Sequence, residues 1–226
     1  MGELTANDRT DKAESGYLRR YEKHFSPIRG EAVKLLELGV REGGSLLMWE
    51  KYFLYGTICG IDLNPAPADI ISDRIITRVG DQSDIGFLTN VASEVAPEGF
   101  DIIIDDASHI GVLSKVSFNH LFFNHLKPGG FYVIEDWGTG YWKSFPDGSS
   151  FNLHVWADRI FPLFPSFLHS HRLRNHDFGM VGFVKQIIDL CAMDDITKPG
   201  LGIPGVCSSA IDFMEISFGL VFVKKK

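Results

Sequence analysis

Short apolar segments alternate with helical stretches along most of this chain, and this alternation constrains the fold more than any other feature. The clearest segment, 102–104, consists of three isoleucines and runs directly into Asp105 and Asp106. A run this apolar is typical of a strand buried on both faces, as central strands of parallel sheets are. Strands separated by single helices form βαβ units. The sequence therefore predicts an α/β fold, with helices on both faces of a mostly parallel sheet.

The predicted elements follow one another in regular order up to residue 137. Strands are expected at 32–40, 56–63, 73–81, 99–107, 129–137, 210–216 and 219–225. Helices are expected at 43–53, 84–95, 114–126 and 179–191. The last two strands, which a turn near Phe218 and Gly219 joins, should close the sheet as an antiparallel pair.

Two segments depart from this order. Residues 1–30 are polar but carry Tyr17, Tyr21 and Phe25 at helical spacing, which indicates an N-terminal helical lead-in that docks on the main body. The stretch 138–178 is rich in aromatic residues, proline and histidine, and we expect it to be an insertion over the strand ends. We therefore predict one ligand-binding domain, 31–226, preceded by the lead-in.

Composition excludes several classes of function. The 226 residues carry a net charge of −7 with no basic stripe, which disfavours a nucleic-acid partner because phosphate binding needs clustered Lys and Arg. Three scattered cysteines argue against a disulfide framework and favour a cytoplasmic location. No apolar run approaches the ~20 residues of a membrane span, so we expect no membrane partner. A homo-oligomer is compatible with all of this.

The turn after the first strand reads ELGVREGGS, and the second strand ends at Asp62, about 20 residues later, the separation typical of a nucleoside-binding βαβ unit. Gly39 permits a sharp turn, while Gly43 and Gly44 would let a ligand approach the backbone. Each feature alone has an ordinary alternative, a plain strand-to-helix turn or a helix-capping aspartate. The GxGxxG pattern of an NAD-dependent oxidoreductase is absent.

Acidic pairs end the fourth and fifth strands, Asp105–Asp106 and Glu135–Asp136. In adjacent strands these four carboxylates would repel one another, and a divalent cation is the simplest relief. Oxygen ligands favour Mg²⁺, Mn²⁺ or Ca²⁺. Some of these carboxylates could cap helices instead.

His109 follows the first acidic pair by about one helical turn. Beside a cation its imidazole would stay neutral and could accept a proton from a substrate hydroxyl. At the third strand end, Asp81 and Gln82 could face an adenine edge, although this segment also suits a helix N-cap.

The segments ELGVREGGS, GIDLN, GDQSD, IIIDDASH and IEDWGTGY, in this order and at these separations, resemble class I S-adenosylmethionine-dependent methyltransferases. More narrowly, they resemble the metal-dependent sugar O-methyltransferases of macrolide biosynthesis, of the mycinamicin and tylosin type. The N-terminal TDK with Tyr17 and Tyr21 is similar to a lead-in of that group. The resemblance covers about residues 10–142, and more loosely the helix at 179–191 and the last strands. It implies a Rossmann-like fold with a seven-stranded sheet.

The resemblance also implies the cofactors, S-adenosylmethionine and Mg²⁺ or Mn²⁺, and a role for each site residue. Contacts to S-adenosylmethionine would come from Glu37, Gly39 and Ser45 at the methionine part, Asp62 at the ribose, Asp81 and Gln82 at the adenine, and Asp105. The metal ligands would be Asp106, Glu135 and Asp136. The general base would be His109, or Asp106 as in other members of the group.

These features predict an O-methyltransferase acting on a hydroxyl of a sugar-containing or other small-molecule natural product. Two alternatives stay open: a catechol-type acceptor, and a non-catalytic nucleoside-binding protein on the same scaffold. Binding of metal by the acidic strand ends would separate the last alternative from the enzyme.

Overall fold

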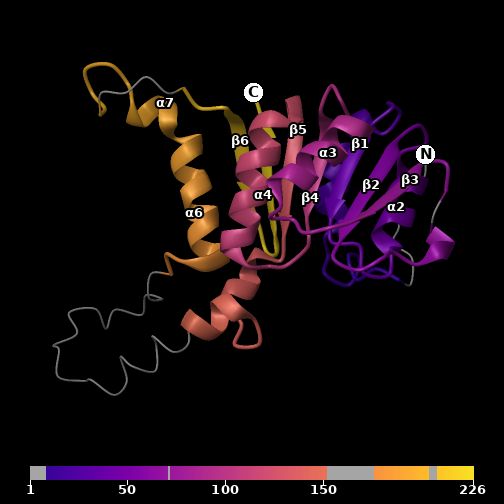
Figure 1. The fold of residues 1–226 in the computed structure, drawn as a ribbon. Coiled ribbons are helices and arrows are strands. Elements are labelled where there is room, and N and C mark those ends of the chain that lie inside the picture. The colour runs from indigo at the N-terminus through magenta and orange to yellow at the C-terminus, as the bar shows by residue number, and fades with distance from the viewer. Residues whose placement is uncertain (1–8, 71, 152–175, 204–207) are drawn as a thin grey trace.

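The computed structural model describes residues 9–70, 72–151, 176–203 and 208–226, and its centre is one seven-stranded sheet (Figure 1). The strand order is β3-β2-β1-β4-β5-β7-β6. The strands are β1 (Lys34–Leu38), β2 (Thr57–Asp62), β3 (Ile75–Val79), β4 (Phe100–Asp105), β5 (Leu126–Glu135), β6 (Ile211–Ile216) and β7 (Leu220–Lys225). β1 to β5 pair in parallel, and β7 is antiparallel to both β5 and β6. The predicted mostly parallel sheet and its antiparallel closure are confirmed.

Helices cover both faces of the sheet. They are α1 (Leu18–Phe25), α2 (Gly44–Tyr52), α3 (Ile85–Val95), α4 (Gly111–Asn124), α6 (Gly179–Cys191) and α7 (Met193–Ile196), with short 3₁₀ turns η1 (Ser26–Ile28), η2 (Ala68–Ile70) and η3 (Trp137–Tyr141). α3, α4 and α6 share one apolar cluster on one face, whereas α1 and α2 share a second cluster on the other. Within the described residues, no helix combines the length and apolarity needed to cross a bilayer.

β4 shows why the central strands are so apolar. Ile103 packs into the cluster under α3, α4 and α6, while Ile102 and Ile104 pack into the cluster under α1 and α2. Side chains of a strand alternate between faces, so a strand covered on both sides needs apolar residues at every position. β4 is therefore apolar on both faces up to Ile104 and ends in the polar Asp105.

Most element boundaries differ from the sequence prediction by one to three residues, and two of the differences have a visible cause in the contacts. β5 begins at Leu126 rather than at 129, because Leu126 already pairs with Phe100; the register then shifts, and the next paired residues are Ile102 and Phe131. α4 begins at Gly111 rather than at 114, where the Asp147 carboxylate accepts a hydrogen bond from the Gly111 amide at 2.8 Å.

The segment after β5 lies beyond the carboxyl end of that strand (Figure 1). It contains η3 and a helical stretch at 146–151. The rest of the predicted insertion up to residue 175 lies outside the described residues. α1 is the helix expected in the lead-in, and its Tyr21 and Phe25 are fully buried against the sheet.

Candidate active site

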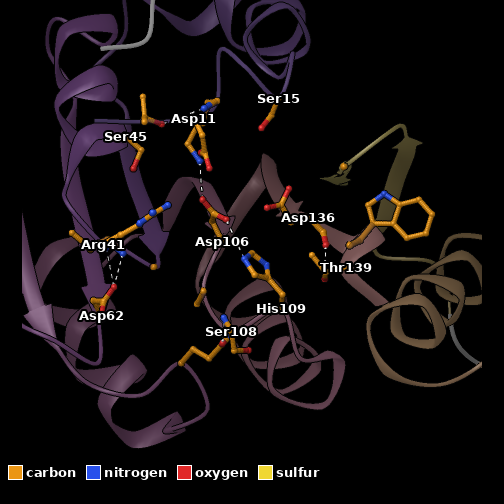
Figure 2. A pocket seen from close by; sticks show the side chains of 18 of the residues that line it. Asp11, Ser15, Arg41, Ser45, Asp62, Asp106, Ser108, His109, Asp136 and Thr139 are labelled. Carbon is orange, nitrogen blue, oxygen red and sulfur yellow. Dashed lines mark hydrogen bonds and ion pairs between the residues drawn. The ribbon is translucent and has the colours of Figure 1, made fainter. Parts of the chain in front are cut away.

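A cavity of about 1190 Å³ lies beyond the carboxyl ends of β1 to β5 (Figure 2). Turns that follow these five strands form most of its wall, and residues 9–12 of the lead-in form another part. The carboxyl ends of the strands are where open α/β sheets bind ligands. The cavity is therefore the first candidate for a functional site.

Strained backbone is concentrated in this wall. Within the described part of the chain, three residues other than glycine have positive φ: Arg41 at 50°, His109 at 52° and Asp136 at 54°. All three line the cavity. Left-handed backbone costs energy for residues with a side chain and persists where the surroundings enforce it, which is common at functional sites.

The turn after β1 is packed tightly against its neighbours. Gly39 has a φ of 94°, and a Cβ there would lie 2.1 Å from the carbonyl oxygen of Asp106. A Cβ at Gly43 would lie 2.2 Å from Ile70, and one at Gly44 would lie 2.4 Å from the backbone of Arg9. The space that a side chain would need at these two glycines is thus taken by the protein's own chain, whereas the backbone of Gly44 still lines the cavity, so the approach of a ligand there stays a prediction. Ser45 lines the cavity at the start of α2.

Asp62 organises this turn at the end of β2. Its Oδ2 accepts hydrogen bonds from the amides of Val40 at 2.8 Å and Arg41 at 3.0 Å, and its Oδ1 accepts one from Asn64 at 2.9 Å. Burial alone would raise the pKa of Asp62, but these amides outweigh it and lower the pKa below its usual range. A carboxylate has about four acceptor positions, so Oδ1 retains room for a ribose hydroxyl, and contact with a ribose stays a prediction.

Gln82 and Asp81 lie side by side after β3 and make different contacts. Asp81 caps its own turn, accepting bonds from the amide and the hydroxyl of Ser83 at 2.7 and 2.8 Å. The Gln82 side chain is buried; it donates to Asp105 and accepts from the Ser108 amide at 3.0 Å. Gln82 thereby ties the turn after β3 to the turn after β4. Both residues line the cavity, so contact with an adenine stays a prediction.

Asp105 lies behind the cavity wall, and its side chain is turned into the protein. Its carboxylate accepts hydrogen bonds from Gln82 at 3.2 Å, Ser117 at 3.3 Å and Tyr132 at 3.4 Å. Burial raises the pKa of Asp105. Asp105 does not line the cavity. Its carboxylate instead holds the Gln82 side chain in place. A direct contact between Asp105 and the cofactor stays a prediction.

The turns after β4 and β5 bring three potential ligands together at the cavity surface. Asp106, His109 and Asp136 each offer one ligand atom, and these atoms lie within 4.8 Å of one another. The Nε2 atom of His109 is 3.8 Å from Oδ1 of Asp106, and Figure 2 shows the two side chains facing each other. The parallel pairing of β4 with β5 places these side chains at one edge, as the sequence predicted.

Glu135 and Glu37 lie deeper, in a second acidic group with Asp106. Lys12, which the sequence analysis did not single out beyond the TDK motif, is buried among them. Its Nζ lies 2.5 Å from Glu135, 3.0 Å from Asp106 and 3.3 Å from Glu37. The repulsion that seemed to require a divalent ion is therefore partly relieved by a lysine from the lead-in.

Burial perturbs the protonation of this inner group. Desolvation lowers the pKa of Lys12, but the neighbouring Asp106, Glu135 and Glu37 carboxylates outweigh it and raise that pKa well above its usual range. Desolvation and the nearby Asp106 raise the pKa of Glu135. Desolvation likewise raises the pKa of Glu37. Lys12 is thus a permanent cation facing carboxyl groups whose charge is costly to bury.

These contacts decide which predicted residues fit a divalent ion. Asp106 and Asp136 supply carboxylate oxygens at the cavity surface, the donors that Mg²⁺ and Mn²⁺ prefer, with His109 beside them. Glu135 does not line the cavity, and its Oε1 accepts from both Lys12 and Tyr21 at 2.5 Å. The outer pair fits the ion, and ligation by Glu135 stays a prediction.

The outer rim of the cavity is aromatic and exposed. Trp142 is 53% exposed and Phe218, in the turn between β6 and β7, is 78% exposed. Tyr141 and Phe145 also line this side. Nothing in the sequence pattern identified Phe218 as a rim residue, because the turn enters the site only through the strand order β5-β7-β6. This rim suits an acceptor that has an apolar part.

Comparison with known proteins gives a consistent set of relatives. No protein-family model matches the chain. It is 33% identical to demethylmacrocin O-methyltransferase of Streptomyces fradiae, over 100% of this chain and 53% of that protein. It is 43% identical to mycinamicin VI 2''-O-methyltransferase of Micromonospora griseorubida, over 55% of this chain and 32% of that protein.

Among solved structures, the MycE methyltransferase of the mycinamycin biosynthetic pathway, in complex with Mg and SAH, superposes with a TM-score of 0.71 at 29% identity. The match covers 98% of this chain and 55% of that one. The chain therefore spans about half the length of the relatives that it matches over its whole length.

Proposed function

Since this chain has the class I methyltransferase fold and is a homologue of the macrolide-sugar O-methyltransferases, we propose that it transfers a methyl group from S-adenosylmethionine to a hydroxyl of a sugar-containing natural product. One observation carries the proposal. A nucleoside-type turn with Asp62 and an acidic pair with His109 open into the same cavity, from adjacent strands.

The cofactor would occupy the side of the cavity formed by the turns after β1, β2 and β3. Asp62 has one acceptor position left on Oδ1 for a ribose hydroxyl, and Asp81 and Gln82 border the adenine side. Ser45 and the Gly39 backbone would border the methionine part, with Glu37 behind them. When bound, S-adenosylmethionine supplies an activated methyl group on sulfur.

The acceptor would enter over Asp106, His109 and Asp136. A divalent ion held by Asp106 and Asp136 would lower the pKa of an acceptor hydroxyl and fix its orientation. The His109 Nε2 lies at the cavity surface and would take the hydroxyl proton, with Asp106 at 3.8 Å stabilising the resulting imidazolium. Methyl transfer is an in-line displacement, so the acceptor oxygen must lie in line with the bond between the methyl carbon and the sulfur. The turns around the cavity would contribute by holding cofactor and acceptor in this orientation.

His109 is the better candidate for the general base, because the Asp106 carboxylate already contacts Lys12 and lies at the proposed metal position. Its Oδ2 lies 3.0 Å from the Lys12 ammonium, and its Oδ1 faces the metal position and His109. A carboxylate held by two cations is a weak proton acceptor. In this arrangement Asp106 orients the imidazole and holds the ion, while His109 moves the proton.

Isothermal titration calorimetry with S-adenosylhomocysteine, with and without Mg²⁺, tests the cofactor half of the proposal. We expect micromolar binding to the wild type, at least tenfold weaker binding to Asp62→Ala, and unchanged binding to Asp73→Ala, an exposed aspartate away from the cavity. Absence of binding to folded wild-type protein would refute the methyltransferase function and favour a non-catalytic scaffold.

The catalytic half needs an acceptor screen with glycosylated macrolides and simple catechols, monitored by release of S-adenosylhomocysteine. His109→Gln should reduce kcat by at least a hundredfold and leave S-adenosylhomocysteine binding within threefold of the wild type, since the ring lies on the acceptor side. Turnover of catechols but not of sugars would overturn the acceptor class and keep the cofactor.

A further inference from the structure

The backbone, rather than a hydrogen bond of the ring, orients His109, the proposed base. Its Nε2 lies 3.8 Å from Oδ1 of Asp106, which is too far for a hydrogen bond, and the ring makes no hydrogen bond with any residue that the structure describes. Its φ of 52° is left-handed backbone, which a residue with a side chain keeps only where its neighbours enforce it. Whatever holds this turn therefore also sets where the imidazole points.

Two hydrogen bonds hold the chain on either side of His109. Before it, the Ser108 amide donates to Oε1 of Gln82 at 3.0 Å. After it, the Ile110 amide donates to the Ser108 hydroxyl oxygen at 3.2 Å. Ser108 and His109 both line the cavity, and Figure 2 shows them at the same end of it. The turn is thus held through Ser108, and Ser108 is held by Gln82.

The Gln82 side chain is itself fixed from behind. Its Nε2 donates to Oδ1 of Asp105 and to the Ser117 hydroxyl oxygen, both at 3.2 Å. A backbone amide can only donate, so Oε1 must face Ser108 and Nε2 must face the other two partners. All three side chains that form this network, those of Gln82, Asp105 and Ser117, are at most 6% exposed. The geometry is that of a rigid link between two turns.

Gln82 also lines the cavity from the turn after β3, on the side assigned to the adenine of the cofactor. We propose that Gln82 is a positioning residue, which holds His109 through Ser108 and connects the cofactor side of the cavity to the base on the acceptor side. A cofactor that rests against this turn restrains the base before the acceptor arrives. The inference rests on the proposed function, in which His109 takes the proton of the acceptor hydroxyl.

The kinetic parameters separate this role from a direct contact with adenine. Removing a residue that only binds adenine weakens cofactor binding and leaves kcat unchanged. Removing a residue that holds the base lowers kcat and leaves cofactor binding intact, and a displacement of about 1 Å can cost about a hundredfold in rate. The two roles therefore differ in which parameter changes.

The experiment compares wild type, Gln82→Leu, Ser108→Ala and Asp84→Ala, with S-adenosylmethionine and a glycosylated macrolide as substrates. Asp84→Ala is the matched control: it removes a side-chain hydrogen bond to the Phe87 amide, 2.9 Å long, in the same loop, but Asp84 does not line the cavity. We expect kcat to fall about ten- to a hundredfold in Gln82→Leu and Ser108→Ala, and to stay unchanged in Asp84→Ala. S-Adenosylhomocysteine binding should stay within about threefold of the wild type in all three variants.

Combination with His109→Gln tests whether Gln82 acts through the base. If it does, the double variant Gln82→Leu with His109→Gln has the kcat of His109→Gln alone. A further loss of about tenfold in the double variant would show an independent effect and overturn the inference. Should Gln82→Leu fail to fold, Ser108→Ala with and without His109→Gln decides the question by the same rule.

Hydrogen–deuterium exchange of the segment 105–113 reads the link without any acceptor. Without ligand, this segment should exchange faster in Gln82→Leu than in the wild type, because the Ser108 amide has lost its acceptor. Saturating S-adenosylhomocysteine should slow its exchange by about threefold more in the wild type than in Gln82→Leu. Equal exchange in the two proteins, with and without ligand, would overturn the inference.

The two proposals fail in different ways. If the wild type methylates the acceptor and Gln82→Leu or Ser108→Ala keeps the wild-type kcat, the positioning role alone is wrong. If the wild type binds no S-adenosylhomocysteine and methylates no acceptor, the proposed function is wrong and the positioning role falls with it.

Discussion

Asp147 joins the starts of α4 and α6, and its removal should destabilise the protein measurably. Its Oδ2 accepts hydrogen bonds from the Gly111 amide at the start of α4 and from the Met180 amide at the start of α6, both at 2.8 Å. Neither helix has a capping side chain of its own, because Ile110 and Phe178 occupy the N-cap positions. One carboxylate thus caps two helices.

The cost follows from these two bonds. Loss of a capping side chain typically costs about 1 kcal/mol per helix, and a carboxylate also stabilises the positive end of each helix dipole. Asp147→Ala should therefore lower the free energy of unfolding by about 2–3 kcal/mol. Asp147→Asn retains one acceptor oxygen but no charge, and should lose about half as much.

Urea denaturation followed by circular dichroism measures this directly. With a slope of about 1–3 kcal/mol per molar urea, Asp147→Ala should lower the midpoint by about 1 M. Asp189→Ala, an exposed aspartate on α6, is the control and should leave the midpoint unchanged. An Asp147→Ala midpoint within experimental error of the control would refute the double cap.

Three further predictions concern the cavity wall. Gly39→Ala should destabilise the protein by more than about 2 kcal/mol and abolish S-adenosylhomocysteine binding, because its Cβ would lie 2.1 Å from the Asp106 carbonyl oxygen; equal stability in a thermal melt would contradict this. Gln82→Leu leaves the Ser108 amide without its acceptor and removes one of the side-chain hydrogen bonds to the buried Asp105 carboxylate, and should cost about 1–3 kcal/mol in urea unfolding. Because the pKa of Asp62 is lowered in the folded state, its stabilising contribution is present above the unfolded pKa of about 3.9 and is lost as the pH falls through the folded value. The stability difference between wild type and Asp62→Asn should accordingly be larger at pH 6 than at pH 3, and an equal difference at both would rule this out.

The strands and the position of the site follow from local sequence because apolar runs mark buried strands and polar residues mark their ends. Asp106, His109 and Asp136 meet because β4 and β5 are adjacent and parallel, which the order of strands and helices predicts. The antiparallel pairing of β6 with β7 is also predictable from the sequence. The turn that joins these two strands is short and has too few residues for the crossover helix that a parallel pair would need.

Lys12 and Asp147 could not be found in the same way. Each makes its decisive contacts over long sequence separations, Lys12 with Glu135 across 123 residues and Asp147 with Gly111 across 36. A lysine within a polar N-terminal segment reads as solvated, because lysine is rarely buried without a partner. The sequence pattern shows neither that Lys12 is buried nor which carboxylates it contacts. From the sequence alone, a metal ion therefore seemed necessary to balance the whole charge of the acidic strand ends.

The central claim is that one cavity binds S-adenosylmethionine and a divalent ion side by side. The most direct measurement is an anomalous difference map from crystals grown with Mn²⁺ and S-adenosylhomocysteine. The account predicts one Mn²⁺ peak between Asp106 and Asp136, with the ribose of the nucleoside beside Asp62. No peak at this pair, or a nucleoside bound away from Asp62, would contradict it.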